Sequence, residues 1–228
     1  MNPEQEIIDS WQDNAAPWID AIALEKIASR VRVTNHAIIA AVNSVNPNTV
    51  LDIGCGEGWL VRALTAEGMD VLGIDVIPTL ITSAKAQGRG RYSIISYEQL
   101  ANGGLQEKFD ALVCNFSLLG KESVESVVKS AASLLHSDGS LVIQTLHPLY
   151  SNNSSGTGVA DYQDGWRKSS WQGCGEGFTN PAPWYFRTLE SWAQLFQRNG
   201  LRLVETREPT DPDSGNIVSI IFIVAVEK

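Results

Sequence analysis

The stretch VLDIGCGEG, residues 50–58, decides the fold. It opens with an apolar run that contains one acid, Asp52, and such a run is typical of a buried β-strand. Gly54, Gly56 and Gly58 follow at every second position, directly before an amphipathic segment. Because glycine has no Cβ, the chain can turn sharply there, and a ligand can approach the backbone at the N-terminus of a helix. The stretch therefore predicts a strand, a ligand-binding loop and a helix, in that order.

A second strand with a second acid follows about twenty residues beyond the glycines, at residues 71–75, VLGID. Asp75 at its end is placed to accept hydrogen bonds from ribose hydroxyls. Asp52 suits a ligand with a cationic amino group and suits a pyrophosphate poorly. Because such strands are neighbours in a parallel sheet, we expect both acids to line one cleft at its carboxyl edge.

Strands and helices continue to alternate along the chain. Beyond the first two strands, we expect strands at 92–95, 109–114, 140–146, 201–206 and 217–226, and helices at 59–67, from Pro78, at about 121–135 and at 189–198. Apolar strands separated by helices predict a parallel sheet covered on both faces. The turn-rich connection at 209–216 favours an antiparallel final pair. We therefore expect an α/β, Rossmann-like fold with a seven-stranded, mostly parallel sheet, an antiparallel last strand and helices on both faces.

The length of 228 residues, with 43% hydrophobic content, fits one domain over residues 1–228. Within it we expect an N-terminal helical cap at 1–48. Residues 148–187 lose all periodicity and are rich in aromatic residues. A structureless stretch of that length in a compact domain predicts a lid or binding insertion.

Taken together, these motifs resemble the class I S-adenosylmethionine-dependent methyltransferase family. The resemblance runs from about Val50 to the C-terminus, and it also includes FDALVCN at 109–115 and LLHSDGSL at 134–141. It implies the Rossmann-like methyltransferase fold, S-adenosyl-L-methionine as cofactor and S-adenosyl-L-homocysteine as product. The cofactor-binding residues that it implies are Asp52, Gly54, Cys55, Gly56, Gly58, Asp75, Val76, Ser96, Tyr97, Asn115 and Phe116.

By this resemblance Asp52 helps to hold the amino-acid end of the cofactor, while Asp75 takes the ribose and Val76 packs on adenine. Asn115 and Phe116 border the methyl-transfer side. Many members place an acid after the third strand to receive the adenine amino group. Here the stretch is Ser-Tyr-Glu at 96–98, so Ser96 or a backbone carbonyl takes that place and Tyr97 covers the ring.

Other nucleotide folds fit the glycine loop less well. Dinucleotide binding needs G-x-G-x-x-G, but Trp59 stands where the third glycine belongs. No G-K-[S/T] follows, so the loop is not a P-loop. Cys55 either takes part in cofactor binding or is a small side chain that fills space in the loop. Two other functions stay open: a tRNA or rRNA methyltransferase, and a non-catalytic regulatory protein that binds the cofactor.

The sequence says less about the residues that bind the methyl acceptor. His147 follows the expected fifth strand and is a candidate base, or a histidine hydrogen-bonded to loop backbone. The aromatic insertion supplies Trp166, Tyr185 and Arg187 as candidate substrate-binding residues, and Trp18 covers the cleft from the cap or packs in a helix interface. The segment around Tyr185 resembles that of small-molecule methyltransferases. We therefore expect a small-molecule methyl acceptor, whose identity and acceptor atom the sequence leaves open.

Composition limits the partners. A net charge of -9 disfavours nucleic acid, and no apolar stretch approaches the roughly 20 residues that span a bilayer. The three cysteines are widely spaced, so neither a disulfide framework nor a metal site is expected. The start lacks a signal peptide, so we expect a cytoplasmic protein, as a monomer or homodimer.

Overall fold

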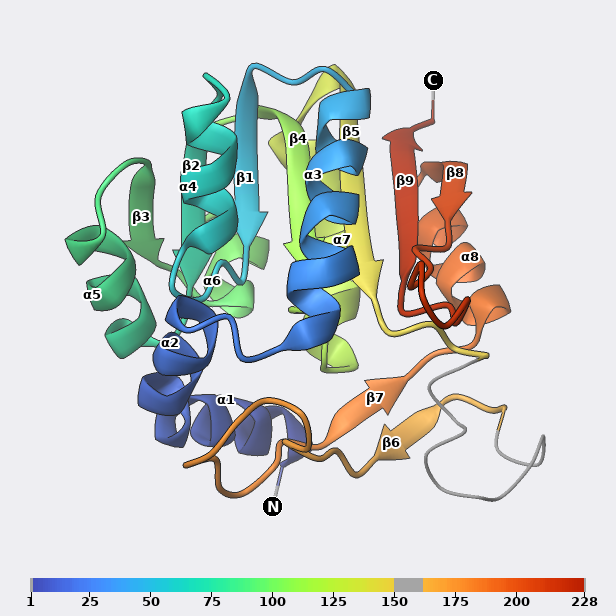
Figure 1. Cartoon of the computed structure of the whole chain (residues 1–228). Helices are drawn as coiled ribbons and strands as arrows, with labels where there is room; N and C mark the ends of the chain where they lie inside the picture. The colour runs from blue at the N-terminus through green and yellow to red at the C-terminus, as the bar shows by residue number, and fades with distance from the viewer. Residues whose placement is uncertain (1, 150–161, 228) are drawn as a thin grey trace.

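The structure, a computed structural model, describes residues 2–149 and 162–227. Its main sheet has seven strands in the order β3-β2-β1-β4-β5-β9-β8 (Figure 1). These strands are β1 (Thr49–Ile53), β2 (Asp70–Asp75), β3 (Arg91–Ile94), β4 (Phe109–Asn115), β5 (Leu135–Thr145), β8 (Leu201–Arg207) and β9 (Ile220–Val226). The first five pair in parallel, and β9 runs antiparallel to both β5 and β8. The expected seven-stranded, mostly parallel sheet with an antiparallel last strand is confirmed.

Helices cover both faces of this sheet (Figure 1). They are α1 (Pro3–Asp13), α2 (Ala15–Ala23), the π-helix η1 (Arg30–Thr34), α3 (Asn35–Ser44), α4 (Trp59–Ala66), α5 (Pro78–Ala86), α6 (Tyr97–Ala101), α7 (Glu122–Leu134) and α8 (Leu189–Arg198). One apolar layer joins the sheet to α7 and α8, and the other joins it to α3, α4 and α5. Neighbouring residues of β1 alternate between these layers, with Leu51 in the first and Val50 in the second.

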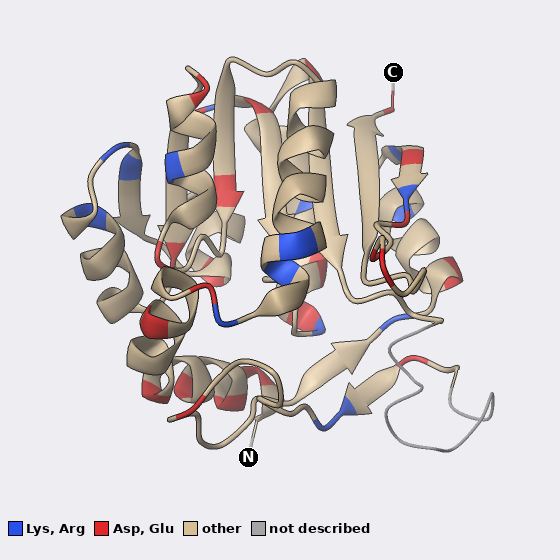
Figure 2. Cartoon of the chain, in the orientation of Figure 1, with Lys and Arg blue, Asp and Glu red and all other residues tan. Residues whose placement is uncertain are grey.

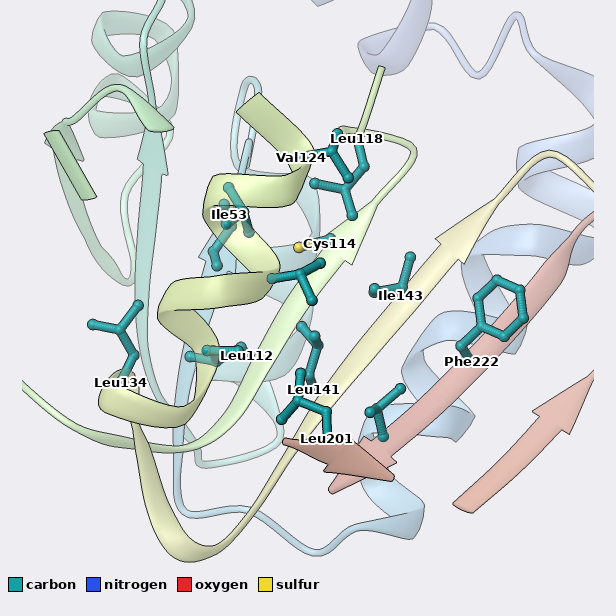
Figure 3. Packing of buried hydrophobic residues seen from close by; sticks show 14 of the residues in the cluster. Ile53, Leu112, Cys114, Leu118, Val124, Leu134, Leu141, Ile143, Leu201 and Phe222 are labelled. Carbon is teal, nitrogen blue, oxygen red and sulfur yellow. The ribbon is translucent and has the colours of Figure 1, made fainter. Parts of the chain in front are cut away.

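The first layer is dense and aliphatic where it meets the sheet centre (Figure 3). Leu112 of β4 and Ile143 of β5 pack there with Val124 of α7, and each is fully buried. Trp192, Phe196 and Phe222 extend the layer toward β8 with ring centroids less than 6 Å apart. This core fixes the strand ends that carry the functional residues.

The carboxyl ends of β1, β2 and β4 lie at one edge of the sheet, and α1 and α2 lie across that edge (Figure 1). Beside α1 lies a second, two-stranded antiparallel sheet of β6 (Gly165–Arg167) and β7 (Trp184–Phe186). Thus the N-terminal helices and the aromatic insertion come together over the strand tips.

Two expectations about local structure were wrong. The strand expected at 140–146 begins earlier, because β5 starts at Leu135 directly after α7, so residues 135–139 lie inside the strand. Gly139 packs there against the Asp110 carbonyl, where a Cβ would lie 3.0 Å from that oxygen, beside a shift in the β4–β5 register. The insertion, expected to lack regular structure, contains the paired strands β6 and β7. The sequence did not predict them because strands of three residues are too short to show an apolar period.

Candidate functional site

The glycine loop after β1 turns toward β2. The amide groups of Gly54 and Cys55 both donate to the Ile74 carbonyl, at 2.8 and 2.9 Å, and Gly56 donates to Asp75 Oδ2 at 2.9 Å. Gly54, Gly56 and Gly58 have φ of +76°, +58° and +83°. The predicted loop therefore requires left-handed backbone at all three glycines, which other residues adopt at a cost.

Space as well as backbone geometry explains two of these glycines. A Cβ on Gly54 would lie 2.4 Å from Ser117 Cβ and 2.7 Å from the Tyr97 hydroxyl. A Cβ on Gly58 would lie 2.7 Å from the ring of Tyr92. At Gly54 the loops after β1 and β4 therefore come into direct contact, which brings the two sides of the cleft together.

Asp75 lies at the tip of β2 and is 9% exposed. Its Oδ2 accepts from Gly56 and its Oδ1 accepts from the Ile77 amide at 2.9 Å. Burial raises the pKa of Asp75, and these backbone amides oppose that rise. Each carboxylate oxygen retains a second lone pair, so the group still has acceptor capacity toward the cleft.

Asp52 at the tip of β1 is 2% exposed, and its Oδ1 has no hydrogen-bond partner among the described residues. Burial, together with the charges of Asp75 and Glu57, raises the pKa of Asp52 to about 8, while Arg30 opposes the rise. A buried carboxyl group without a partner is costly unless a ligand completes it. Asp52 is therefore suited to receive a cation.

Arg30 supplies the opposite charge, and the sequence analysis missed it. It begins η1, is 9% exposed and lies over the rings of Trp18 and Trp59, at 5.2 and 5.0 Å. Its Nη2 has no hydrogen-bond partner among the described residues, and burial lowers its pKa to about 10. A guanidinium placed in this way is suited to bind an anion. The sequence carries no motif around Arg30; only the folded chain brings it to the cleft.

One cavity of about 820 Å³ is lined by Arg30, Asp75 and part of the glycine loop, whereas Asp52 and Gly58 are not among its lining residues. Gly54, Cys55, Gly56, Asp75 and Val76 line this cavity, together with Trp18 from the cap. The Trp18 indole nitrogen lies 3.6 Å from the point that a Cβ on Gly56 would occupy. The volume lies within the range of small-molecule sites.

Ser96 and Tyr97 also line this cavity, but each already has a structural hydrogen bond. Ser96 caps α6, and its side chain accepts from the Gln99 amide at 3.1 Å. The Tyr97 hydroxyl donates to the Ser117 carbonyl at 3.0 Å. The departure from the family pattern after β3 thus corresponds to a capped helix that begins at the cavity wall.

Asn115, the last residue of β4, and Phe116, which follows it, also line the cavity. The Oδ1 of Asn115 is buried without a partner among the described residues. Phe116 has φ of +54°, and its amide donates to the Gln144 carbonyl at 2.8 Å. A non-glycine residue in left-handed backbone is uncommon and costs free energy, and such strain clusters at functional sites.

The aromatic candidates of the insertion divide between wall and support. Tyr185 lines the cavity, whereas Trp166 is not among its lining residues and packs edge-on against Tyr185 at 5.5 Å. Arg187 also lies at the wall, but its guanidinium donates to the carbonyls of Gly120 and Lys121 at 2.9 and 2.8 Å. Burial lowers the pKa of Arg187. These two hydrogen bonds support the loop after β4.

His147 is 1% exposed and is not among the residues that line the cavity. Its Nε2 lies 2.9 Å from Glu208 Oε1, and its Nδ1 accepts from the Leu149 amide at 3.2 Å. Of the two readings of this residue, the geometry favours the histidine that is hydrogen-bonded to loop backbone.

Within residues 2–149 and 162–227, no cluster of three or more His, Cys, Asp or Glu side chains is arranged to hold a metal ion. The thiols of Cys55, Cys114 and Cys174 are free, and burial raises the pKa of each. Over the same residues, no helix has the length and apolar character needed to cross a membrane.

The fold and the cleft define a class of Rossmann-like proteins that bind a ligand at the tips of β1 and β2. Comparison with known proteins then gives the family: residues 27–206 match the sequence profile of a methyltransferase domain. The chain belongs to this methyltransferase family, within the class I S-adenosylmethionine-dependent superfamily.

Two curated relatives are ubiquinone biosynthesis O-methyltransferases. That of Rickettsia canadensis is 24% identical over 80% of this chain and 75% of its own length. That of Xylella fastidiosa strain M23 is 29% identical over 64% of this chain, and the match spans only 61% of that relative. A crystal structure from Listeria monocytogenes, assigned as an S-adenosylmethionine-dependent methyltransferase, superposes with a TM-score of 0.69 at 21% identity, over 85% of this chain and 96% of that one.

Proposed function

We propose that this protein transfers a methyl group from S-adenosylmethionine to a small molecule. The observation that carries the proposal is the charge pattern of the cleft. The buried guanidinium of Arg30 lines the cavity, and the buried carboxyl of Asp52 lies at the tip of β1, two residues before the lining residue Gly54; each group has an atom that lacks a partner among the described residues. The amino-acid end of the cofactor carries one ammonium and one carboxylate, so it is complementary to this pair.

The remaining contacts follow from the positions of the side chains. Asp75 would accept the ribose hydroxyls, Gly54, Cys55 and Gly56 would lie against the cofactor, and Gly58 would support the loop from behind. Val76 and Ile77 provide an apolar surface for adenine, with Ser96 and Tyr97 at its rim. Trp18 and Trp59 hold Arg30 toward the cofactor carboxylate.

The cofactor, once bound, supplies an electrophilic methyl on a sulfonium for in-line displacement. The protein must align the nucleophile and keep water out. Asn115 and Phe116, in the loop that Arg187 and Tyr185 support, border the place where the acceptor would meet the methyl. The Asn115 carboxamide oxygen can accept a hydrogen bond from an acceptor hydroxyl or amine.

The acceptor side of the cavity favours a compact molecule with an apolar body. Its walls include Ile8 and Trp11 of α1, Leu118 and Leu119 after β4, and Trp184 of β7. The two relatives described above are named for O-methylation in ubiquinone biosynthesis, which supports an apolar acceptor with a hydroxyl group. The net charge of -9 makes an RNA acceptor the weaker candidate.

We extend the proposal to the organisation of the chain. Residues 1–228 form one methyltransferase domain, in which 1–48 act as the helical cap and 148–187 as the lid. Part of that lid, residues 150–161, lies outside the described residues. The protein works in the cytoplasm as a monomer or homodimer.

A labelling experiment tests the function. Cell extract is incubated with the protein and methyl-labelled S-adenosylmethionine, and the labelled product is identified by mass spectrometry. Label in a small molecule supports the proposal. Label confined to RNA would overturn the substrate class. Calorimetric binding of S-adenosylhomocysteine with no labelled product in any fraction would indicate a non-catalytic binding protein.

A further inference from the structure

The helix α1 forms one wall of the cavity, and its attachment is unlike that of the rest of the fold. Ile7, Ile8 and Trp11 face the cavity. The cap helices α1 and α2 pack in a small apolar cluster with Ile77 and Leu80, which is separate from the two layers that cover the sheet. A helix held outside the main core can leave without unfolding that core.

The N-terminal end of α1 is held by the carboxylate of Glu4. Glu4 Oε1 accepts from the amides of Lys121 and Glu122 at 2.7 and 2.9 Å, and its Oε2 accepts from the Ser123 hydroxyl at 2.6 Å. These donors form the N-terminus of α7, whose amides lack helical partners and carry partial positive charge. Glu4 therefore caps a helix more than a hundred residues away in the chain.

The chain makes room for this carboxylate at Gly120. A Cβ on Gly120 would lie 2.1 Å from Ser123 Oγ, 2.2 Å from Glu4 Oε2 and 2.8 Å from Glu4 Cδ. Gly120 is not among the glycines with positive φ, so left-handed backbone is not the reason for glycine here. The hydrogen-bonded pair of Glu4 and Ser123 occupies the space that a side chain would take.

The other end of α1 is held differently. Asn14, between α1 and α2, is fully buried, and its side chain bonds both backbone groups of Thr179: Nδ2 donates to the carbonyl at 2.7 Å and Oδ1 accepts from the amide at 2.8 Å. The Ser10 hydroxyl donates to the Asn180 carbonyl at 2.5 Å. This end is fastened to the insertion by buried neutral groups, whereas the Glu4 end is fastened by one part-exposed charged group.

We propose that Glu4 is the latch of a movable wall: its carboxylate on the N-terminus of α7 holds α1 closed over the cleft, and its release lets α1 swing about Asn14 so that the cofactor product leaves. This inference rests on the proposed function, since the moving ligand is the spent cofactor. Figure 2 shows the acidic positions along α1 in red, where this helix lies across the carboxyl edge of the main sheet. Only Glu4 among them is seated on α7.

The test is the exchange rate of S-adenosylhomocysteine, followed by stopped-flow fluorescence of the tryptophans that line the cleft. Glu4→Gln removes the charge from the latch, and we expect both association and dissociation to become about tenfold faster, as loss of a charge-assisted hydrogen bond implies. The dissociation constant should change less than threefold, because the wall moves but the cofactor contacts remain. Glu6→Gln, on the same helix but without contact to α7, is the matched control.

Gly120→Ala provides an independent test, because its Cβ displaces both the Glu4 carboxylate and the Ser123 hydroxyl that donates to it, without altering the charge of Glu4. It should accelerate exchange as Glu4→Gln does. The two effects should not add in the double variant, since both open the same latch. Faster hydrogen exchange at residues 3–13 in both variants, with unchanged exchange in β1 and β4, identifies local opening and excludes general misfolding.

The outcomes separate the two proposals. If the unmodified protein binds no S-adenosylhomocysteine, the proposed function fails. If it binds, and Glu4→Gln and Gly120→Ala both exchange at the rate of Glu6→Gln, the latch is refuted while the function stands.

Discussion

Replacing Asp52 by asparagine should remove a pH dependence from cofactor binding. The pKa of Asp52 in the ligand-free cleft is about 8, chiefly because the carboxyl is buried. At pH 7 the group is therefore mostly protonated, and a cationic ligand must first displace the proton. One pKa unit costs about 1.4 kcal/mol, so this step costs about that much at pH 7 and about twice as much at pH 6.

The expected result follows from the sign of this shift. In the unmodified protein, affinity for S-adenosylhomocysteine should rise by up to about tenfold per pH unit between pH 6 and 8 and then level off. Asp52→Asn has no proton to lose, and it also lacks the charge-assisted bond, which contributes about 1.5–3 kcal/mol. The variant should therefore bind more weakly by about tenfold or more at pH 8.5, and nearly as well as the unmodified protein at pH 6.

Isothermal titration calorimetry of both proteins from pH 6 to 8.5 provides the measurement. The ligand's own titration affects both proteins equally, so the ratio of the two dissociation constants isolates Asp52. Buffers of different ionisation enthalpy should also show proton release at pH 7 in the unmodified protein alone. A ratio that stays constant over the range would refute the assignment of Asp52 to the ammonium group.

Three further variants test the cleft, and two of them have a stability readout. Asp75→Ala should weaken binding of S-adenosylhomocysteine by about 1–3 kcal/mol through loss of the ribose contacts, and unchanged affinity in calorimetry would reject that role. Arg30→Met keeps an unbranched side chain between Trp18 and Trp59 but removes the charge. It should raise the dissociation constant at least about tenfold, while the melting temperature stays the same or rises, because a buried charged group whose Nη2 has no hydrogen-bond partner among the described residues is removed. Gly54→Ala should lower the free energy of unfolding by more than Gly68→Ala, since both glycines have positive φ but of the two only Gly54 is crowded. The left-handed strain alone costs about 1–2 kcal/mol in each variant. Equal denaturation midpoints for the two variants would show that the loops after β1 and β4 relax freely.

The pKa of Asp52 also links pH to folding. A carboxyl group whose pKa is higher in the folded than in the unfolded chain loses stability as pH rises from about 4 to about 8. In the ligand-free protein this group alone should contribute a loss of up to about 1.4 kcal/mol per pH unit over that range. Asp52→Asn should remove this contribution, which thermal melts at pH 5 and pH 8 would reveal as a smaller difference between the two.

The sequence predicted the sheet because each strand carries its own signal. Val50 to Ile53 and Phe109 to Cys114 are apolar runs bounded by loops, and parallel pairing of such runs brings Asp52 and Asp75 to one edge without further information. The glycine loop was equally legible, since its spacing reflects backbone geometry that few other residues adopt.

The rest of the site depends on contacts between distant segments, which leave no local pattern. Arg30 stands in a helical stretch like any surface arginine, and only the packing of the cap makes it a buried charge beside Asp52. Arg187 and His147 looked free in the sequence, whereas the fold surrounds them with carbonyl, amide and carboxylate partners. A polar residue that the sequence places beside an expected cleft can hold the cleft wall in place instead of binding a ligand.

The bond between Asn14 and Thr179 joins residues 165 positions apart. During synthesis the first two helices leave the ribosome long before the residues that fasten them, so the sheet can form while its edge is still open. The cofactor cleft would then acquire its last wall only after most of the chain has been made.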